Sequence, residues 1–144
     1  MAHADPVRIA TVTTDPIDLA ALREQVPTSA DGAVVVFEGV VRDHDEGRGV
    51  HALAYSAHPS ARDELAATAA DVQSRHPETV VAVVHRIGPL AIGDVALACV
   101  VASAHRAEAF AACAELVDEV KLRVPIWKEQ RFDDGSVEWV SALE

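Results

Sequence analysis

Two strongly apolar segments, 79–87 and 94–102, constrain the fold of this 144-residue chain more than any other part of its sequence. Only the short segment 88–93, with a glycine at each end, separates them. Apolar runs of this length that are bounded by glycine and proline are typical of strands buried in a core. The sequence therefore predicts a core hairpin with a longer connecting loop.

The other apolar segments predict further strands on both sides of this hairpin. They are 7–13, which alternates like an edge strand, 33–42, 50–57, 126–132 and 137–140. Asp133-Asp-Gly-Ser136 lies between the last two and is a hairpin signal, whereas 43–49 reads as a polar loop.

Three helices are expected between the strands. Asp15-Pro16 predicts an N-cap and a first-turn proline for a helix that runs to about Val26. His58-Pro59-Ser60 opens a second helix to about His76, with Leu65, Ala69 and Val72 on one face. The third helix ends at Pro125 and has an apolar face formed by Ala109, Phe110, Cys113, Leu116, Val117 and Val120. Because hairpins are frequent, we expect an α+β fold with a mixed, mainly antiparallel sheet, about three helices and a single domain over 1–144.

Composition indicates the compartment and excludes some classes of function. No stretch approaches the 18 apolar residues of a membrane span, and the N-terminal Met1-Ala-His-Ala-Asp-Pro lacks the features of a signal peptide. We therefore expect a cytoplasmic protein, with Cys99 and Cys113 as small core residues in a reducing compartment. The net charge of −11 and the six aromatic residues argue against nucleic-acid binding.

The distribution of lysine points to a chemical site. Lys121 and Lys128 are the only lysines, while the other ten of the 12 cationic Lys and Arg side chains are arginine. A lysine can lose its proton when it is desolvated or placed near other cations, but arginine cannot. The two lysines are therefore candidates for acid/base or nucleophilic chemistry. The alternative is that a GC-rich genome depletes lysine and the two fell close together by chance.

Other cations predict an anion site. Arg42 ends an apolar strand, and His105-Arg106 stand at the start of the third helix, where unpaired N–H groups favour phosphate or carboxylate. Exposed surface cations are the alternative interpretation. His44, His51 and His58 cross a loop and a strand, so we expect no metal site from them. His85-Arg86 is interpreted as structural, and Trp127 and Trp139 are expected to pack the final hairpin over the core.

Six motifs, in consistent order over about 33–140, resemble the molybdopterin synthase catalytic (large) subunit family. They are Phe37-Glu-Gly-Val-Val-Arg42, His85-Arg-Ile-Gly88 followed by Ile92-Gly93, Ser103-Ala-His-Arg106, Lys121, Pro125-Ile-Trp-Lys128 and Trp139-Val140. The chain departs from the family at three places. The family usually has Glu around the tyrosine where this chain has Leu53-Ala-Tyr-Ser56, and a second basic residue where this chain has Glu129. Family members often have a basic tail after the last Trp-Val, whereas only Ser141 to Glu144 follow Val140 here.

The resemblance implies a sulfurtransferase of molybdenum cofactor biosynthesis. A ubiquitin-like small subunit with a C-terminal thiocarboxylate would supply sulfur, and two transfers would convert cyclic pyranopterin monophosphate into the dithiolene of molybdopterin. By similarity, the backbone of Val40 and Val41 and the side chains of Arg42, His105 and Arg106 would bind the substrate. Lys121 and Lys128, with Glu129 and Gln130, would line the place where sulfur arrives. The lysines would transfer protons and stabilise negative charge, or one of them would form a covalent adduct. No cofactor or metal is implied.

One helix carries both Arg106 and Lys121, which predicts a dimer. Fifteen residues at about 1.5 Å each separate their backbones by roughly 22 Å. We therefore expect a homodimer, within a heterotetramer that includes the small subunit, in which His105-Arg106 of one copy reach the lysine pocket of the other. The alternative function is a non-catalytic module that binds a phosphorylated ligand or a partner tail. The presence of two lysines argues against it, because arginine would bind a phosphate equally well.

Overall fold

The computed structural model describes residues 5–141 and consists of two sheets and three helices within that range. Residues 1–4 of the stretch that lacks signal-peptide features, and residues 142–144 of the short C-terminal end, lie outside the described residues. The elements in chain order are β1 (Val7–Thr13), α1 (Leu19–Gln25), β2 (Ala33–Val40), β3 (His44–Asp45), β4 (Arg48–Ala57), α2 (Ala61–Arg75), β5 (Thr79–Arg86), β6 (Gly88–Leu90), β7 (Val95–Ser103), α3 (Arg106–Arg123), β8 (Ile126–Phe132) and β9 (Val137–Ser141).

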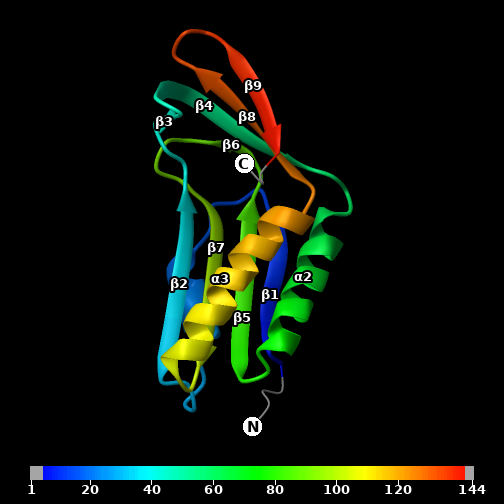
Figure 1. The fold of residues 1–144 in the computed structure, drawn as a ribbon. Coiled ribbons are helices and arrows are strands. Elements are labelled where there is room, and N and C mark those ends of the chain that lie inside the picture. Colours follow the sequence, from blue (N-terminus) through cyan, green and yellow to red (C-terminus); the bar gives the residue numbers. More distant parts are fainter. Residues whose placement is uncertain (1–4, 142–144) are drawn as a thin grey trace.

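The first sheet has the strand order β1-β5-β7-β2, and the predicted core hairpin forms its centre. β1 runs parallel to β5, whereas β5–β7 and β7–β2 are antiparallel pairs. Figure 1 shows α2 and α3 side by side across one face of this sheet. The expected α+β class with a mixed, mainly antiparallel sheet is confirmed.

Both faces of the first sheet are covered, which explains why the sequences of β5 and β7 are apolar without alternation. On one face, Leu65 and Val72 of α2 and Leu116 of α3 are fully buried in the main core cluster. On the other face, Leu22 of α1 and Val26 pack against alternate residues of the same strands. The expected burial of Cys99 and Cys113 is confirmed.

The second sheet has the order β3-β4-β8-β9, with β6 paired to β4, and lies at one end of the first sheet (Figure 1). The segment predicted as a polar loop contains β3, which pairs with the start of β4 through a two-residue turn. Glu46 and Gly47 have φ values of 51° and 78°, the left-handed conformation that such turns require. The hairpin of β8 and β9 is confirmed, with Gly135 at φ 87° in its turn.

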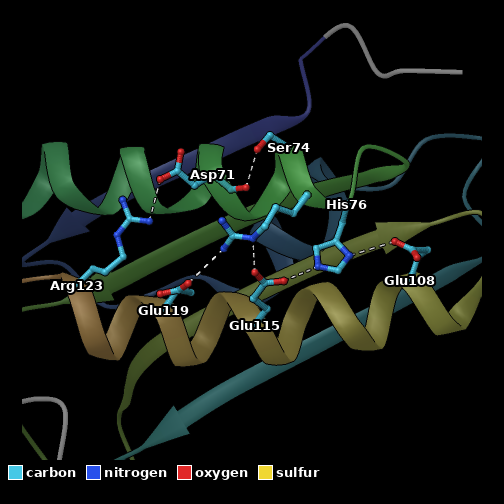
Figure 2. Close-up of polar contacts among 8 residues, drawn as sticks. Asp71, Ser74, His76, Glu108, Glu115, Glu119 and Arg123 are labelled. Carbon is cyan, nitrogen blue, oxygen red and sulfur yellow. Dashed lines mark hydrogen bonds and ion pairs between the residues drawn. The ribbon is translucent and has the colours of Figure 1, made fainter.

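A polar cluster joins the outer sides of α2 and α3, as Figure 2 shows. Arg75 is paired with Glu115 and Glu119, and Arg123 with Asp71. His76, at the end of α2, is hydrogen-bonded to Glu108 and Glu115. These contacts connect the helices over most of the length of α3, which fixes the end of α3 that carries Lys121.

Three further expectations about local structure are wrong. The first helix begins at Leu19, because Asp18 and not Asp15 is its N-cap and accepts a hydrogen bond from the Ala21 N–H at 3.0 Å. Phe110 lies on the outer side of α3 and is 61% exposed. Trp127 and Trp139 are 42% and 63% exposed, because they belong to the face of the second sheet that points away from the core.

Candidate active site

A cavity of about 330 Å³ lies where the end of the first sheet meets the second sheet. Five polar side chains from separate parts of the fold line it: Arg42 after β2, Tyr55 of β4, His85 of β5, Lys121 of α3 and Lys128 of β8. Its apolar wall includes Phe37, Val40, Leu97, Val120, Val124 and Ile126. A small cavity with an apolar wall and a few convergent polar groups is typical of a binding site for a small molecule.

Local sequence brings the two lysines together. Pro125 disfavours helical backbone at the preceding residue, and Val124 is extended with ψ 123°, so α3 ends and the chain enters β8. Lys128 then lies directly opposite Tyr55 on β4. Lys121, in the last turn of α3, and Lys128 consequently line the same cavity.

The environment of Lys128 makes its ammonium easier to deprotonate than that of an exposed lysine. Burial of this half-buried side chain lowers the pKa of its ammonium, and the nearby charges of Arg42 and Lys121 lower it further. The carboxylates of Asp45 and Glu138 act in the opposite direction. The net shift is downward, which suits a lysine that transfers a proton or acts as a nucleophile.

His85 supplies a neutral hydrogen-bond acceptor among these cations. Its Nδ1 is 2.8 Å from the carbonyl oxygen of Arg86 and must donate, because a carbonyl only accepts. Burial, with a contribution from Lys121, lowers the pKa of His85 to about 4, so the ring is neutral at physiological pH and Nε2 carries a lone pair. The Tyr55 ring meets the imidazole edge-on, with 4.9 Å between centroids.

The structure brings four of the predicted site residues together at the cavity: Val40, Arg42, Lys121 and Lys128. Arg42 is largely exposed at this place, and its Nη2 donates to Asp45 Oδ1 at 3.1 Å. Val41 is buried instead, and its backbone N–H and C=O are bonded to Asp94 and Gly93.

Glu129 and Gln130 do not line the cavity. Successive strand residues point to opposite faces, so Glu129 lies on the outer face of the second sheet, where it is paired with Arg131 at 2.8 Å. Gln130 lies on the same face as Lys128 but is buried, and its Nε2 donates to Asp45 Oδ2 at 2.9 Å. Its contact with Asp45 connects it to Arg42 and so only indirectly to the site.

His105 and Arg106 lie at the opposite end of α3 from Lys121. Both are exposed, and neither makes a side-chain hydrogen bond or an ion pair within the part of the chain that the structure describes. They therefore form no part of the cavity within one copy of the chain.

Sequence reasoning missed Phe37, Tyr55 and His85 as cavity residues. Phe37 and Tyr55 are half-buried aromatic residues in strands, a pattern that core packing also produces. His85 carried a usable signal, since it is a titratable residue inside an otherwise apolar strand. The two cysteines are excluded as nucleophiles, because burial raises the pKa of both thiols, that of Cys113 to about 11.

Residues 5–141 contain neither a cluster suited to a metal ion nor a helix suited to a membrane. No group of three or more His, Cys, Asp or Glu side chains there is placed to hold a metal ion. No helix in that range is long and apolar enough to cross a membrane.

Known proteins resemble this chain over most of its length. Residues 12–123 match the model of the family described as MoaE protein. A molybdopterin synthase catalytic subunit from Staphylococcus carnosus is 40% identical over 130 residues, which cover 90% of this chain and 86% of that protein. One from Nostoc sp. is 39% identical over 132 residues, 90% of this chain and 80% of its own length.

Solved structures have the same fold. The crystal structure of molybdopterin synthase from Staphylococcus aureus superposes with a TM-score of 0.84 and 36% identity, over 90% of this chain and 95% of that one. A complex of subunits 1 and 2 of the molybdopterin-converting factor from Helicobacter pylori contains a chain with a TM-score of 0.68, over 96% of this chain and 90% of that one. At 21% identity, the second likeness concerns the fold alone.

Proposed function

The chain belongs to the MoaE protein family, and from this premise we propose that it is a molybdopterin synthase catalytic subunit that transfers sulfur to cyclic pyranopterin monophosphate. It is thus an enzyme of molybdenum cofactor biosynthesis. The observation that carries the proposal is the convergence of both lysines of the chain with Arg42 on one cavity.

The cavity suits a substrate with an anionic group and a flat ring. Arg42 is exposed at the cavity and can form charge-assisted hydrogen bonds with a phosphate. Phe37 and Leu97 offer apolar surface to a ring system, and the Nε2 lone pair of His85 can accept from a ring N–H.

The two lysines would act where sulfur moves. In each transfer a carbon–sulfur bond of the thiocarboxylate breaks and a carbon–sulfur bond to the pyranopterin forms. An oxygen from water or from the pyranopterin replaces the sulfur, which leaves a carboxylate on the donor. Lys121, as an ammonium, stabilises the negative charge that develops, and Lys128, whose pKa is lowered, exchanges the proton or forms a covalent adduct.

The sulfur donor would be the C-terminal thiocarboxylate of a ubiquitin-like small subunit. The proposed assembly is a homodimer of this chain with two small subunits, in which His105 and Arg106 of one copy complete the cavity of the other. The proposed location is the cytoplasm, where a thiocarboxylate and the two free thiols stay reduced.

One assay tests the proposed reaction directly. The protein is incubated with a thiocarboxylated small subunit and cyclic pyranopterin monophosphate, and formation of the dithiolene product is followed. We expect product with the thiocarboxylate and none with the corresponding carboxylate. If the small subunit supports another molybdopterin synthase but gives no product here, the non-catalytic binding module is the better assignment.

A further inference from the structure

Asp45 is a carboxylate that connects Arg42, which lines the cavity, to the buried Gln130 beside it. It ends the two-residue strand β3, and the tight turn of Glu46 and Gly47 holds it against β4. Its Oδ1 accepts from Arg42 Nη2 at 3.1 Å, and its Oδ2 accepts from Gln130 Nε2 at 2.9 Å. The two oxygens therefore have different partners.

These partners differ in burial. Gln130 is only 2% exposed, so its amide is a fixed donor that determines where the carboxylate lies. The Arg42 side chain is 63% exposed, and Asp45 is its one hydrogen-bond partner among residues 5–141. The chain of contacts from Gln130 through Asp45 therefore holds the guanidinium of Arg42 at the cavity.

Asp45 is also the anionic group that most reduces the positive charge of the cavity. Arg42 and Lys121 are the cations that act on the pKa of Lys128, while the carboxylates are Asp45 and, with a smaller effect, Glu138. Glu138 already has a cation of its own, since it is paired with Arg48. Arg48 in turn lies over the Phe132 ring and is also held by Asp134 and Ser136.

We propose that Asp45 is a positioning residue that holds Arg42 in the ligand-free cavity and supplies the counter-charge that an incoming phosphate replaces. The proposal rests on the proposed function only where Arg42 is assigned to the phosphate of the substrate. An anion that reaches Arg42 must compete with Asp45, so the carboxylate weakens the binding of small anions and keeps Lys128 more protonated.

Replacement of Asp45 by asparagine isolates this effect. Asparagine has the same shape and can still accept from Gln130, but it has no negative charge with which to hold Arg42. Asp43→Asn is a matched control, because it removes the same charge two residues away, where the carboxylate is exposed and contacts only His44 among the described residues.

The first measurement is the affinity for inorganic phosphate by isothermal titration calorimetry at constant pH and ionic strength. We expect Asp45→Asn to bind phosphate roughly two- to fivefold more tightly than the wild type, the range that a partly exposed ion pair supports. Asp43→Asn should bind like the wild type. Equal affinities of the two variants, weaker binding by Asp45→Asn, or no measurable binding by any of the three proteins would overturn the proposal.

The second measurement is the titration of Lys128 by NMR in protein labelled with ¹⁵N-lysine. Only two lysine side chains give signals, and a Lys121→Arg variant assigns them. Asp45→Asn should move the Lys128 midpoint to lower pH, since the groups that remain are mainly the cations Arg42 and Lys121. Asp43→Asn should leave it in place. An unmoved midpoint in Asp45→Asn would also overturn the proposal, because a purely structural role predicts that result.

Gln130→Met removes the amide that holds the Asp45 carboxylate and leaves the charge unchanged. We expect it to bind phosphate more tightly than the wild type, but by less than Asp45→Asn does. An unchanged affinity in a folded variant would contradict the role given to Gln130. None of these measurements depends on sulfur transfer. A failed dithiolene assay would therefore leave the Asp45 result interpretable, and the reverse also holds.

Discussion

At the scale of single residues, the two lysines differ in a way that their spacing in the sequence does not show. Lys128 is half-buried and its pKa is lowered, whereas Lys121 is exposed at the end of α3. Arginine has the charge of lysine but does not release its proton. The distinction between a proton-transfer residue and a point charge can therefore be tested by one substitution at each position.

We expect Lys128→Arg to lose nearly as much dithiolene-forming activity as Lys128→Ala, on the order of 100-fold or more, while the KM for the pyranopterin changes little. If the neutral amine is the active form, the rate rises with pH, with a midpoint below the ordinary lysine value of 10.5. Steady-state kinetics with saturating small subunit give both quantities. An arginine variant that keeps most of the rate would reduce Lys128 to a point charge.

At the scale of elements, the contact between α2 and α3 contains a titratable group, His76 (Figure 2). Burial alone would lower its pKa, but hydrogen bonds with Glu115 and Glu108 and their charges outweigh burial and raise it. A raised folded-state pKa means that the stabilisation is fully present below the unfolded value of 6.5 and is lost as pH rises through the folded value. The α2–α3 contact should therefore weaken as the pH rises above 6.5.

The variant His76→Gln tests this expectation. The wild type should be more stable than His76→Gln at pH 6, and the difference should shrink as the pH is raised above 6.5. Urea unfolding at a series of pH values measures it, with His51→Gln as the control for the loss of an exposed imidazole. A difference that stays constant with pH would show that the protonated imidazole contributes nothing.

The start of α1 gives a second prediction at this scale. Asp18 accepts a hydrogen bond from the backbone of Ala21, whereas the side chain of Asp15 caps nothing in the described residues. We expect Asp18→Ala to lower the free energy of unfolding by about 1 kcal/mol. Asp15→Ala should change it by less than about 0.5 kcal/mol. Chemical denaturation distinguishes the two, and equal losses would contradict the observed cap.

Elements with strong local signals could be predicted from the sequence. The β5–β7 hairpin, the burial of Leu65 and Val72 and the end of α3 at Pro125 all follow from periodicity, glycine or proline. Asp15-Pro16 was predicted to cap the first helix, but Asp18 is the cap, and the helix that follows it packs Leu22 into the second core cluster. Phe110 was misplaced because an apolar residue at helical spacing need not face the core.

The cavity was only partly predictable for a related reason. Arg42, Lys121 and Lys128 stand out by residue type. Tyr55 joins the cavity because β4 pairs with β8, which puts it opposite Lys128, and His85 joins it because β5 ends at the cavity. Asp45 depends on a two-residue strand that no periodicity indicates. Long-range pairing of this kind is a property of the assembled sheets and not of any local segment.

At the scale of the whole molecule, the two ends of α3 pose a geometric problem. Arg106 and Lys121 stand 15 residues apart on the helix α3, so their backbones are separated by roughly 22 Å. Lys121 lines the cavity and Arg106 does not. If both belong to one active site, the simplest arrangement is a twofold dimer in which each cavity receives His105 and Arg106 from the other copy.

Mixing two inactive variants tests this arrangement. In a dimer of one Arg106→Ala copy and one Lys121→Ala copy, a shared site places both defects in one cavity and leaves the other cavity intact. With random assortment half of the dimers are mixed and each has one active cavity, so dithiolene formation should recover to about a quarter of the wild-type rate. If each site were built within one copy, every cavity would carry a defect and no activity would return. Mass spectrometry verifies subunit exchange, and no recovery after complete exchange would refute the shared site.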